Sequence, residues 1–414
     1  MRTLTKPARV LAIAQLTNSF GDGAFYVCSA LYFTRVVGLS PTQVGLGLTL
    51  AWAVGFLAGV PLGHLADRRG PRGTAVLLAM STAAAVGCFL FVRSFGPFLL
   101  AACLYTTSQS GLAAARQALL AGLVEPAQRT RVRAYLQSTL NAGLAVGAGL
   151  GGLALYLDTP AAYLSVLAMD AVSFLAAALV LRGLPAVPAS PPAAAGEPTL
   201  AVLRDRPYAV ISALNMVMLL NMPLLSLVIP LWIVQRTEAP RWLVSALFVL
   251  NTVSVVLFQV RVARRVRGLR SAARLARLSG VVMLVACAVF AVSAAGSSAW
   301  LAAGALLIGA GLQVAGEMML ASGAWEISFD LAPADKQGQY QGFFGAGTAV
   351  ARMIGPVALT ALILTWGVPG WLLLGGLFLA VGLAMGPAVR WAEGRRAAVR
   401  PAPAGALATP VTVG

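Results

Sequence analysis

Twelve long apolar stretches follow one another along this chain, separated by short segments where polar and basic residues gather. A helix needs about 20 mostly apolar residues to span the hydrocarbon core of a bilayer. The stretches are too long and too uniformly apolar for barrel strands, which alternate apolar and polar positions over about ten residues. The pattern therefore predicts twelve spanning helices, near residues 10–34, 42–63, 73–92, 97–121, 132–156, 161–181, 208–234, 242–262, 274–295, 299–323, 338–365 and 370–390.

Composition and charge favour an all-α membrane protein and predict its orientation. Charged residues make up only 10% of the chain, against about 25% in soluble domains. With the N-terminus inside, 25 of the 30 lysines and arginines fall on the cytoplasmic side and four outside. Positive residues favour cytoplasmic loops, so the net charge of +17 predicts topology, with both termini in the cytoplasm, and not nucleic-acid binding. Tryptophans near the predicted span ends are expected to anchor helices at the interface: Trp232, Trp242, Trp300, Trp366, Trp371 and Trp391.

The longest loop divides the chain into halves. Residues 183–207 are rich in proline and alanine and predict a cytoplasmic linker. It separates two six-helix bundles, at residues 1–182 and 208–391, and residues 392–414 are expected to form a disordered cytoplasmic tail.

The two halves align weakly, which indicates an internal repeat. Repeated halves with a binding site between them are common in transporters. The matches occur in the same order in both halves, so we expect a duplication. They pair Pro41 with Pro240, Gly70 with Gly268, and Pro126 with Pro333.

Charge gathers at GHLADRRGPRG, residues 63–73, between the second and third spans. Gly70 and the proline after it predict a tight cytoplasmic turn, with Asp67 near the start of the third helix. Topology explains the arginines but not Asp67. It also leaves unexplained three glycines that recur before the acid: Gly55, Gly59 and Gly63.

The run G-x-L-A-D-R-R-G-x-R resembles the loop 2–3 signature of the major facilitator superfamily. With the twelve spans, the linker and the repeat, this resemblance covers essentially the whole chain. It implies that Asp67 contacts the cytoplasmic end of helix 11 in the outward-open state. A carboxylate gains about 0.3–1 kcal/mol at a helix N-terminus. This sequence departs from the family pattern at Pro71, where the family usually has a basic residue, and at Arg265, in the acidic position of the second half. The implied gate comprises Gly63, Asp67, Arg68, Gly70 and Arg72.

Ionisable residues within spans are functional candidates, because each costs at least about 2.5–3.5 kcal/mol on insertion scales. Asp22 lies near mid-bilayer in the first span, Glu317 in the inner half of the tenth, and Arg352 in the eleventh. Burial disfavours an ionised carboxylate, so Asp22 or Glu317 is a candidate to exchange protons. A static ion pair between Glu317 and Arg352 is the alternative.

Other polar residues in the spans have simpler interpretations beside functional ones. Asn18 and Asn221 are candidates to bind substrate, or to join neighbouring helices by hydrogen bonds. Asp170 is expected to be structural, and Arg116 is interpreted as a loop charge near the cytoplasmic end. His64 is a candidate proton carrier, although a loop-end role is the simpler interpretation. The family resemblance implies a central cavity lined by helices 1, 4, 7 and 10, which we expect to be mostly apolar.

The fifth span carries glycines every four residues, which predicts a flat face for close helix contact. It resembles the helix 5 motif of proton-coupled exporters, except that Ala148 replaces the motif's proline; plain packing of small residues is the alternative. The face comprises Gly143, Gly147 and Gly151.

We expect a secondary active transporter that exports a small apolar or amphiphilic compound, such as a drug or secondary metabolite, against proton influx. Its partners would be the substrate, protons and the lipid bilayer, and it would act as a monomer in the bacterial inner membrane. The sequence has no phosphate-binding loop, dinucleotide fingerprint, metal-ligand cluster or nucleophile motif, so we expect no enzyme, cofactor or metal. The alternatives are a proton-driven nutrient importer on the same fold and a non-transporting receptor or scaffold; a membrane enzyme ranks behind both.

Overall fold

The computed structural model describes residues 4–191, 198–296 and 298–399, and the regular structure in these ranges is helical. Four helices of the N-terminal half begin with proline, which has no N–H to leave unpaired at the first helical position. Ser40 and Gln43 add a reciprocal capping box to α2. This half contains α1 (Lys6–Leu31), α2 (Pro41–Arg69), α3 (Pro71–Phe89), α4 (Phe95–Leu123), α5 (Pro126–Leu157) and α6 (Pro160–Arg182).

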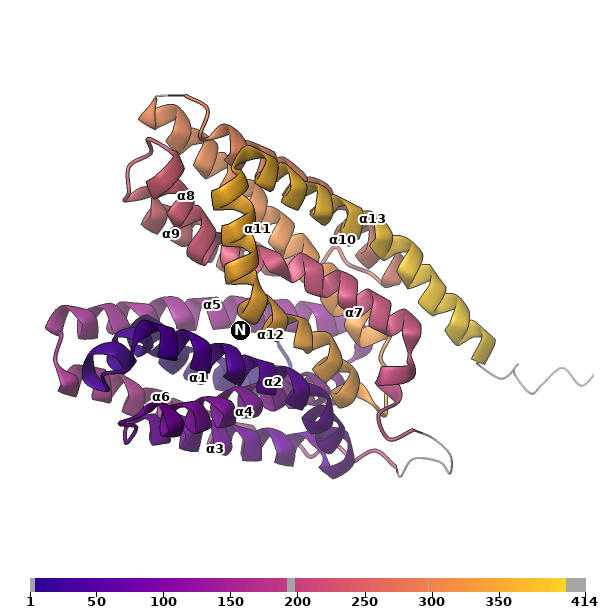
Figure 1. Ribbon diagram of the computed structural model, residues 1–414. Coiled ribbons are helices and arrows are strands. Elements are labelled where there is room, and N and C mark those ends of the chain that lie inside the picture. The colour runs from indigo at the N-terminus through magenta and orange to yellow at the C-terminus, as the bar shows by residue number, and fades with distance from the viewer. Residues whose placement is uncertain (1–3, 192–197, 297, 400–414) are drawn as a thin grey trace, which may run out of the picture.

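The C-terminal half has a matching set, drawn from pink to yellow in Figure 1. Its elements are α7 (Arg206–Met218), α8 (Ile229–Arg236), α9 (Leu243–Ala263), α10 (Leu269–Val292), α11 (Ala299–Asp330), α12 (Gln337–Thr360) and α13 (Val368–Val399). The elements from α7 to α8 together form one span, Arg206–Arg236. Ten spans in the described residues are both long and apolar enough to cross a membrane, and α1 and α4, of 26 and 29 residues, complete the predicted twelve.

The seventh span is interrupted where the sequence predicted a continuous helix. Between α7 and α8 lie a 3-10 turn (Leu219–Asn221) and a π-helical turn (Leu224–Val228), separated by Met222 and Pro223. Proline has no N–H to donate to the preceding turn and its ring crowds that turn. The interruption therefore has a local cause at Pro223.

Helix packing repeats between the halves. In the first half, α1 packs on α5 and α6, and α3 packs on α4 and α6. In the second, α7 packs on α12 and α13, and α10 packs on α11 and α13. The halves meet through α2 on α12 and through α5 on α9. Figure 1 shows α12 reaching from the upper bundle to the lower one. This arrangement confirms the prediction of two six-helix repeats.

Helix boundaries near Asp67 and near the C-terminus differ from the sequence predictions. The helix of the second span continues to Arg69, so Asp67 lies in the last turn of α2 and not near the start of α3. Gly70 alone turns the chain, with φ of +91°. Instead of a disordered tail from residue 392, α13 continues to Val399; residues 400–414 lie outside the described part of the chain. The linker residues 192–197 also lie outside it.

Two of the predicted interface tryptophans are core residues instead. Trp232 and Trp371 are fully buried, with ring centroids 5.7 Å apart, and Trp371 also packs on Phe290. Trp232 donates its indole N–H to Ser293 Oγ at 3.0 Å. A sequence position near a span end does not show which side of the helix faces lipid. The other four predicted interface tryptophans are exposed: Trp242, Trp300, Trp366 and Trp391.

Candidate functional site

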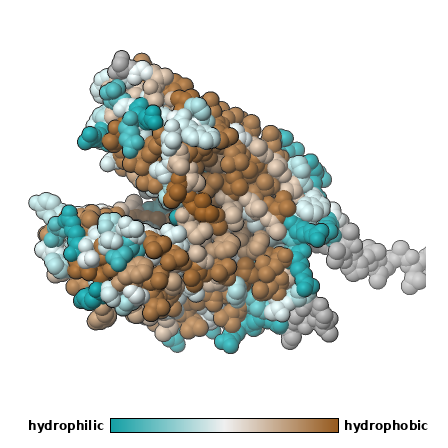
Figure 2. Space-filling view, viewed as in Figure 1, coloured by the Kyte–Doolittle hydropathy of each residue, from teal (hydrophilic) through white to brown (hydrophobic). Residues whose placement is uncertain are grey.

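A central cavity of about 440 Å³ lies between the two halves. Figure 2 shows the molecule hollowed between the upper and lower bundles, at the end remote from the linker and from α13's C-terminus. All five candidates from the spans line this one cavity, although they come from four different elements: Asn18, Asp22, Asn221, Glu317 and Arg352.

Asp22 belongs to a polar stripe along the cavity side of α1. Gln15, Asn18, Asp22 and Tyr26 recur at intervals of three or four residues and line the cavity. Asn18 donates to Asp22 Oδ2 at 3.0 Å, whereas Asp22 Oδ1 has no hydrogen-bond partner within the described residues. One carboxylate oxygen is therefore held in place and the other is available to a proton or a ligand.

Asp170 lies behind Asp22, not in the cavity. It is completely buried in α6, and its carboxylate packs against the backbone of α1 at Gly21. Ser173 lies beside it and donates to Asp170 Oδ1 at 3.4 Å. This packing agrees with the structural role expected for Asp170.

The alternative of an ion pair between Glu317 and Arg352 is not seen among the described residues. Glu317 accepts a hydrogen bond from Asn251 of α9 at 3.2 Å. The Arg352 guanidinium instead lies over Trp52, 4.6 Å from the ring centroid, and within 5.9 Å of the Tyr26 centroid. The aromatic faces of the N-terminal half thus hold this cation by cation–π attraction.

The cavity is mostly apolar, as expected, but it holds more charge than the sequence indicated, because two further arginines line it. Arg116 of α4 was interpreted as a loop charge, and Arg133 of α5 was counted among the cytoplasmic residues, yet both face the cavity. Their positions on the helices could have indicated this, because each arginine shares a helix face with a polar residue. Arg133 and Gln137 are one turn apart on α5, and Gln109 and Arg116 are two turns apart on α4.

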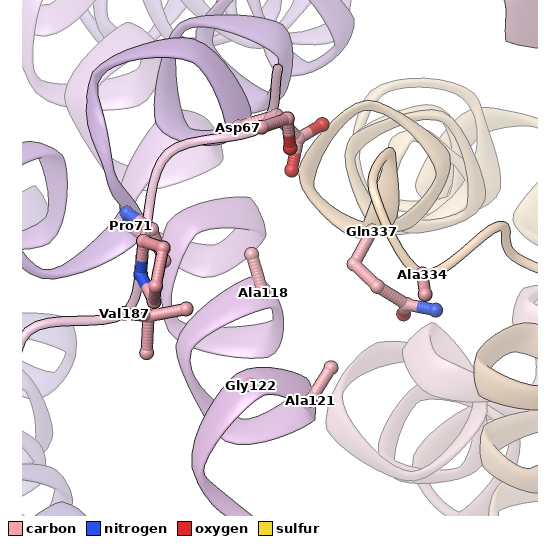
Figure 3. A pocket seen from close by; sticks show the side chains of 10 residues that line it. Asp67, Pro71, Ala118, Ala121, Gly122, Val187, Ala334 and Gln337 are labelled. Atoms are coloured by element: carbon pink, nitrogen blue, oxygen red, sulfur yellow. The ribbon is translucent and has the colours of Figure 1, made fainter.

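Asp67 closes the opposite end of the molecule. Its carboxylate accepts the backbone N–H of Gly338 at 2.6 Å and that of Gln339 at 2.9 Å, in the first turn of α12. Figure 3 shows the side chain directed at α12, beside a small cavity of about 60 Å³. Because the seventh span is divided into α7 and α8, the eleventh span is α12. The bonds from α12 to Asp67 are therefore the contact with helix 11 that the family resemblance implies. The unpaired N–H groups of a helix N-terminus favour a negative charge there.

Glycines allow α2 and α12 to approach at backbone distance beside Asp67. A Cβ on Gly63 would collide with the carbonyl oxygen of Gly338, and one on Gly342 would collide with that of Gly59. Gly55, one turn earlier, faces Thr106 of α4 instead. Close packing of three helices thus explains the glycines that topology left unexplained.

The first part of the linker lies across this closed end. Arg72 donates to the carbonyl of Leu184 at 2.8 Å, and Arg68 donates to that of Pro191 at 3.3 Å. Ser190 donates its backbone N–H to the Asp67 carbonyl at 2.8 Å, and its hydroxyl to the carbonyl of Asp335 before α12. Two motif arginines therefore hold the linker by hydrogen bonds, a role that topology alone did not predict.

Glu326, which the sequence did not single out, makes a second contact between the halves. It lies near the C-terminal end of α11 and accepts from Thr130 Oγ1 of α5 and from the backbone N–H of Gly268 at 3.0 Å. Gly268 matches Gly70 in the repeat, and Arg265 occupies the position of Asp67. The second half thus has an acid at its own turn, supplied by a neighbouring helix.

The glycine face of α5 packs on α1. A Cβ on Gly147 would collide with the Phe20 carbonyl, and a Cβ on Gly143 would lie 2.8 Å from Ser19 Cβ. Gly151 faces Ala24 in the same way. The face therefore supports the helix that carries Asp22.

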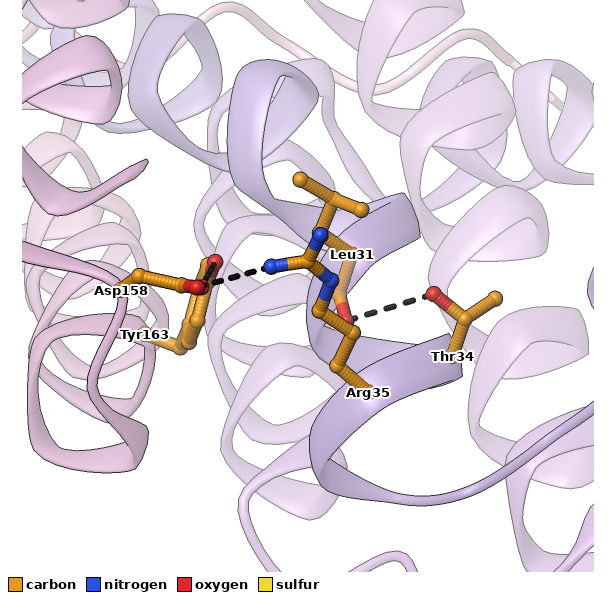
Figure 4. A network of polar contacts seen from close by, with 5 residues as sticks. All are labelled: Leu31, Thr34, Arg35, Asp158 and Tyr163. Atoms are coloured by element: carbon orange, nitrogen blue, oxygen red, sulfur yellow. Dashed lines mark hydrogen bonds and ion pairs between the residues drawn. The ribbon is translucent and has the colours of Figure 1, made fainter. Parts of the chain in front are cut away.

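An ion pair stabilises the turn at the open end, between α5 and α6. Arg35 donates to Asp158 Oδ2 at 2.8 Å, and Tyr163 donates to Asp158 Oδ1 at 2.6 Å (Figure 4). The hydrogen bond from Tyr163 is the main cause that lowers the pKa of Asp158, and the Arg35 charge lowers the pKa further.

Comparisons with known proteins agree with this architecture. The model of the Major Facilitator Superfamily matches residues 11–356. A search of curated proteins gave no match. The solved structure of the human organic anion transporter MFSD10 (TETRAN) is 16% identical, has a TM-score of 0.71, and covers 92% of this chain and 98% of its own. A bacterial homologue of the iron transporter ferroportin, in an outward-facing state, is 19% identical with a TM-score of 0.73, covering 94% and 100%. At these identities the likeness shows the fold alone.

Proposed function

This chain belongs to the major facilitator superfamily, and on that premise we propose that it is a proton-coupled transporter that moves a small amphiphilic compound by alternating access. One observation carries the proposal. A cavity lined by both halves is open at one end, and the contact of Asp67 with α12 closes the other. Rocking the halves about a central site is the usual mechanism of such repeats.

Proton coupling is assigned to Asp22, with Glu317 as the second candidate. Both acids line the cavity, one from each half. The unpartnered Oδ1 of Asp22, within the described residues, supports the first choice, whereas Asn251 already donates to Glu317. A buried acid that meets water alternately from each side can bind a proton on one side and release it on the other.

The membrane setting follows from charge. We assign the linker end to the cytoplasm of a bacterial inner membrane, because the loops at that end hold most of the lysines and arginines. The cavity then opens to the outside. One chain contains both halves of the cavity, which supports a functional monomer.

Export is the first direction to test, because an amphiphilic substrate that displaces a proton from Asp22 would be driven out by proton influx. Accumulation of dyes and antibiotics is measured in an efflux-deficient bacterium with and without this chain. Export predicts lower accumulation that a protonophore abolishes. Accumulation that is unchanged across the panel argues against export.

Coupling is tested in everted vesicles. Substrate-stimulated proton flux is expected to disappear with Asp22→Asn or Glu317→Gln and to persist with Asp158→Asn, which removes an acid outside the cavity. Intact coupling in both cavity variants would exclude these two acids as the proton carriers.

A second candidate, proton-driven import, gains support from the three cavity arginines. Arg116, Arg133 and Arg352 outnumber the two cavity acids, which favours a negatively charged substrate. An anion beside Asp22 stabilises the protonated acid, so anion and proton would bind together and travel in the same direction. Uptake of a labelled substrate into cells, driven by an imposed pH gradient, distinguishes this candidate from export.

A further inference from the structure

The inner part of the cavity contains two cations from neighbouring helices. Arg116 of α4 approaches Gln15 at 3.5 Å, while its Nε and Nη2 atoms have no hydrogen-bond partner in the described part of the chain. The Arg133 guanidinium of α5 lies over Trp325 of α11, 5.2 Å from the ring centroid. Both arginines line the central cavity.

Neither cation forms an ion pair within 4 Å with a described acid, and the Asp22 carboxylate acts on Arg116 only from farther away. Among the described residues, the one ion pair within 4 Å joins Arg35 and Asp158 at the open end. The Arg116 and Arg133 charges also act unfavourably on each other. A desolvated cation is costly unless an opposite charge and hydrogen bonds compensate it. Two guanidinium groups that line one cavity without an ion pair within 4 Å therefore favour an anion beside them.

The surroundings indicate the shape of that anion. Guanidinium groups bind carboxylate, sulfate or phosphate through paired N–H bonds. Gln137, one turn after Arg133, adds an amide on the same side, and Trp325 adds an apolar face. A cavity of about 440 Å³ is in the range that holds one small organic ligand.

We propose that Arg116 and Arg133 bind the anionic group of the substrate, and that the substrate is a small organic anion with an aromatic or aliphatic body that packs on Trp325. This inference rests on the proposed transport function and specifies its substrate class. It also favours import over export, because an anion in this subsite binds together with a proton at Asp22 and the two would move in the same direction.

The charges that face Asp22 support this linkage. Without a ligand, the charges of Arg116 and Arg352 favour the ionised form of Asp22. An anion at the subsite adds a negative charge nearby, and so favours the protonated form of Asp22. By reciprocity, protonation then strengthens anion binding. The titratable and charged groups around Asp22 are Tyr26 on α1, Tyr105 and Arg116 on α4, Asp170 on α6 and Arg352 on α12.

The test uses three probes with one ring system and different charges: 2-naphthoate, 2-naphthamide and 2-naphthylmethylammonium. Binding to the purified full-length chain in lipid nanodiscs is followed by calorimetry. We expect 2-naphthoate to bind most tightly and more tightly at lower pH. Arg133→Gln or Arg116→Gln should weaken it about tenfold to a hundredfold, leaving 2-naphthamide unchanged. Arg131→Gln, on α5 but outside the cavity lining, is the matched control and should change neither.

Two further variants keep the test independent of folding defects and of charge alone. Arg133→Lys retains the positive charge and loses the planar fork, so it should bind 2-naphthoate with an affinity between those of wild type and Arg133→Gln. Asp22→Asn should bind 2-naphthoate without the pH dependence. Variants are compared only when their melting temperatures match that of the wild type.

The subsite and the transport function fail separately. Equal affinities for 2-naphthoate and 2-naphthamide, or an equal loss with Arg131→Gln, would overturn the subsite. Protonophore-sensitive transport of a neutral compound in that case would leave the proposed function standing. Arginine-dependent 2-naphthoate binding without transport of any compound would support the subsite and overturn the function.

Discussion

Asp67→Asn tests whether a single carboxylate holds the cavity open on one side by closing the other. The substitution keeps the size of the side chain and removes its charge. Asp67 accepts two backbone N–H bonds from α12, at 2.6 and 2.9 Å. Asparagine offers one carbonyl oxygen, and its own amide N–H₂ would face the second donor.

The expected magnitude follows from these two bonds. A hydrogen bond to a charged group contributes about 1.5–3 kcal/mol, and the charge gains about 0.3–1 kcal/mol from the helix N-terminus. In the variant, the state in which the contact of residue 67 with α12 is closed loses most of one such bond and the charge interaction. In the other state the contact with α12 is broken and water solvates the side chain, whether it is aspartate or asparagine. The substitution therefore changes the free energy of that state little. We expect a shift of about 2 kcal/mol, or about thirtyfold in the ratio of the two states.

The ratio is measured from distances between spin labels at Tyr156 and Trp300. These positions are 85% and 78% exposed and lie at the open end, one on each half. In the wild type the long distance should dominate, and Asp67→Asn should transfer population to the short one. The labels are attached to cysteines introduced at these two positions, in a variant whose own cysteines have been replaced. Those are Cys28, Cys88, Cys103 and Cys287.

Asp335→Asn is the matched control. Asp335 lies just before α12, and its carboxylate does not accept the N–H of Gly338 or Gln339. Removing this charge should leave the long distance dominant. A change of less than threefold with Asp67→Asn, or an equal change with Asp335→Asn, would refute the argument that charge at the start of α12 sets this equilibrium.

Three further predictions follow from the packing and from the open end. Gly63→Ala should shift the same distance distribution toward the short form, because its Cβ collides with α12, whereas Gly45→Ala, with open space around it, should not. Gly147→Val should lower stability by about 1–3 kcal/mol, seen as a lower melting temperature, since the added atoms overlap the backbone of α1. Tyr163→Phe should raise the pKa of Asp158 toward its ordinary value. A lowered pKa stabilises the fold above the unfolded pKa, and this contribution disappears as pH falls through the folded pKa, so the acid limb of the melting curve should move to higher pH; an unmoved limb would contradict the assignment.

Local chemistry made the helices and the gate predictable. Each span is a property of about 20 adjacent residues, and the turn at Gly70 depends on its neighbours alone. The polar stripe of α1 was visible in part, since Asn18 and Asp22 are one turn apart. The boundary errors arose at Asp67 and beyond residue 392, where helices extend past the apolar segment into polar sequence.

The sequence by itself determined the number of spans, the repeat and the charges that Asp22, Glu317 and Arg352 carry into the membrane, because insertion depends on the composition of each segment. Only the tertiary structure decided what those charges meet. Arg133 lies over Trp325 from the other half, and Arg352 lies over Trp52, while Glu317 bonds with Asn251 instead of Arg352. Such partners depend on the rotation and tilt of whole helices. Those are set by contacts between residues far apart in the chain, such as the close approach of α2 to α12 at their glycines.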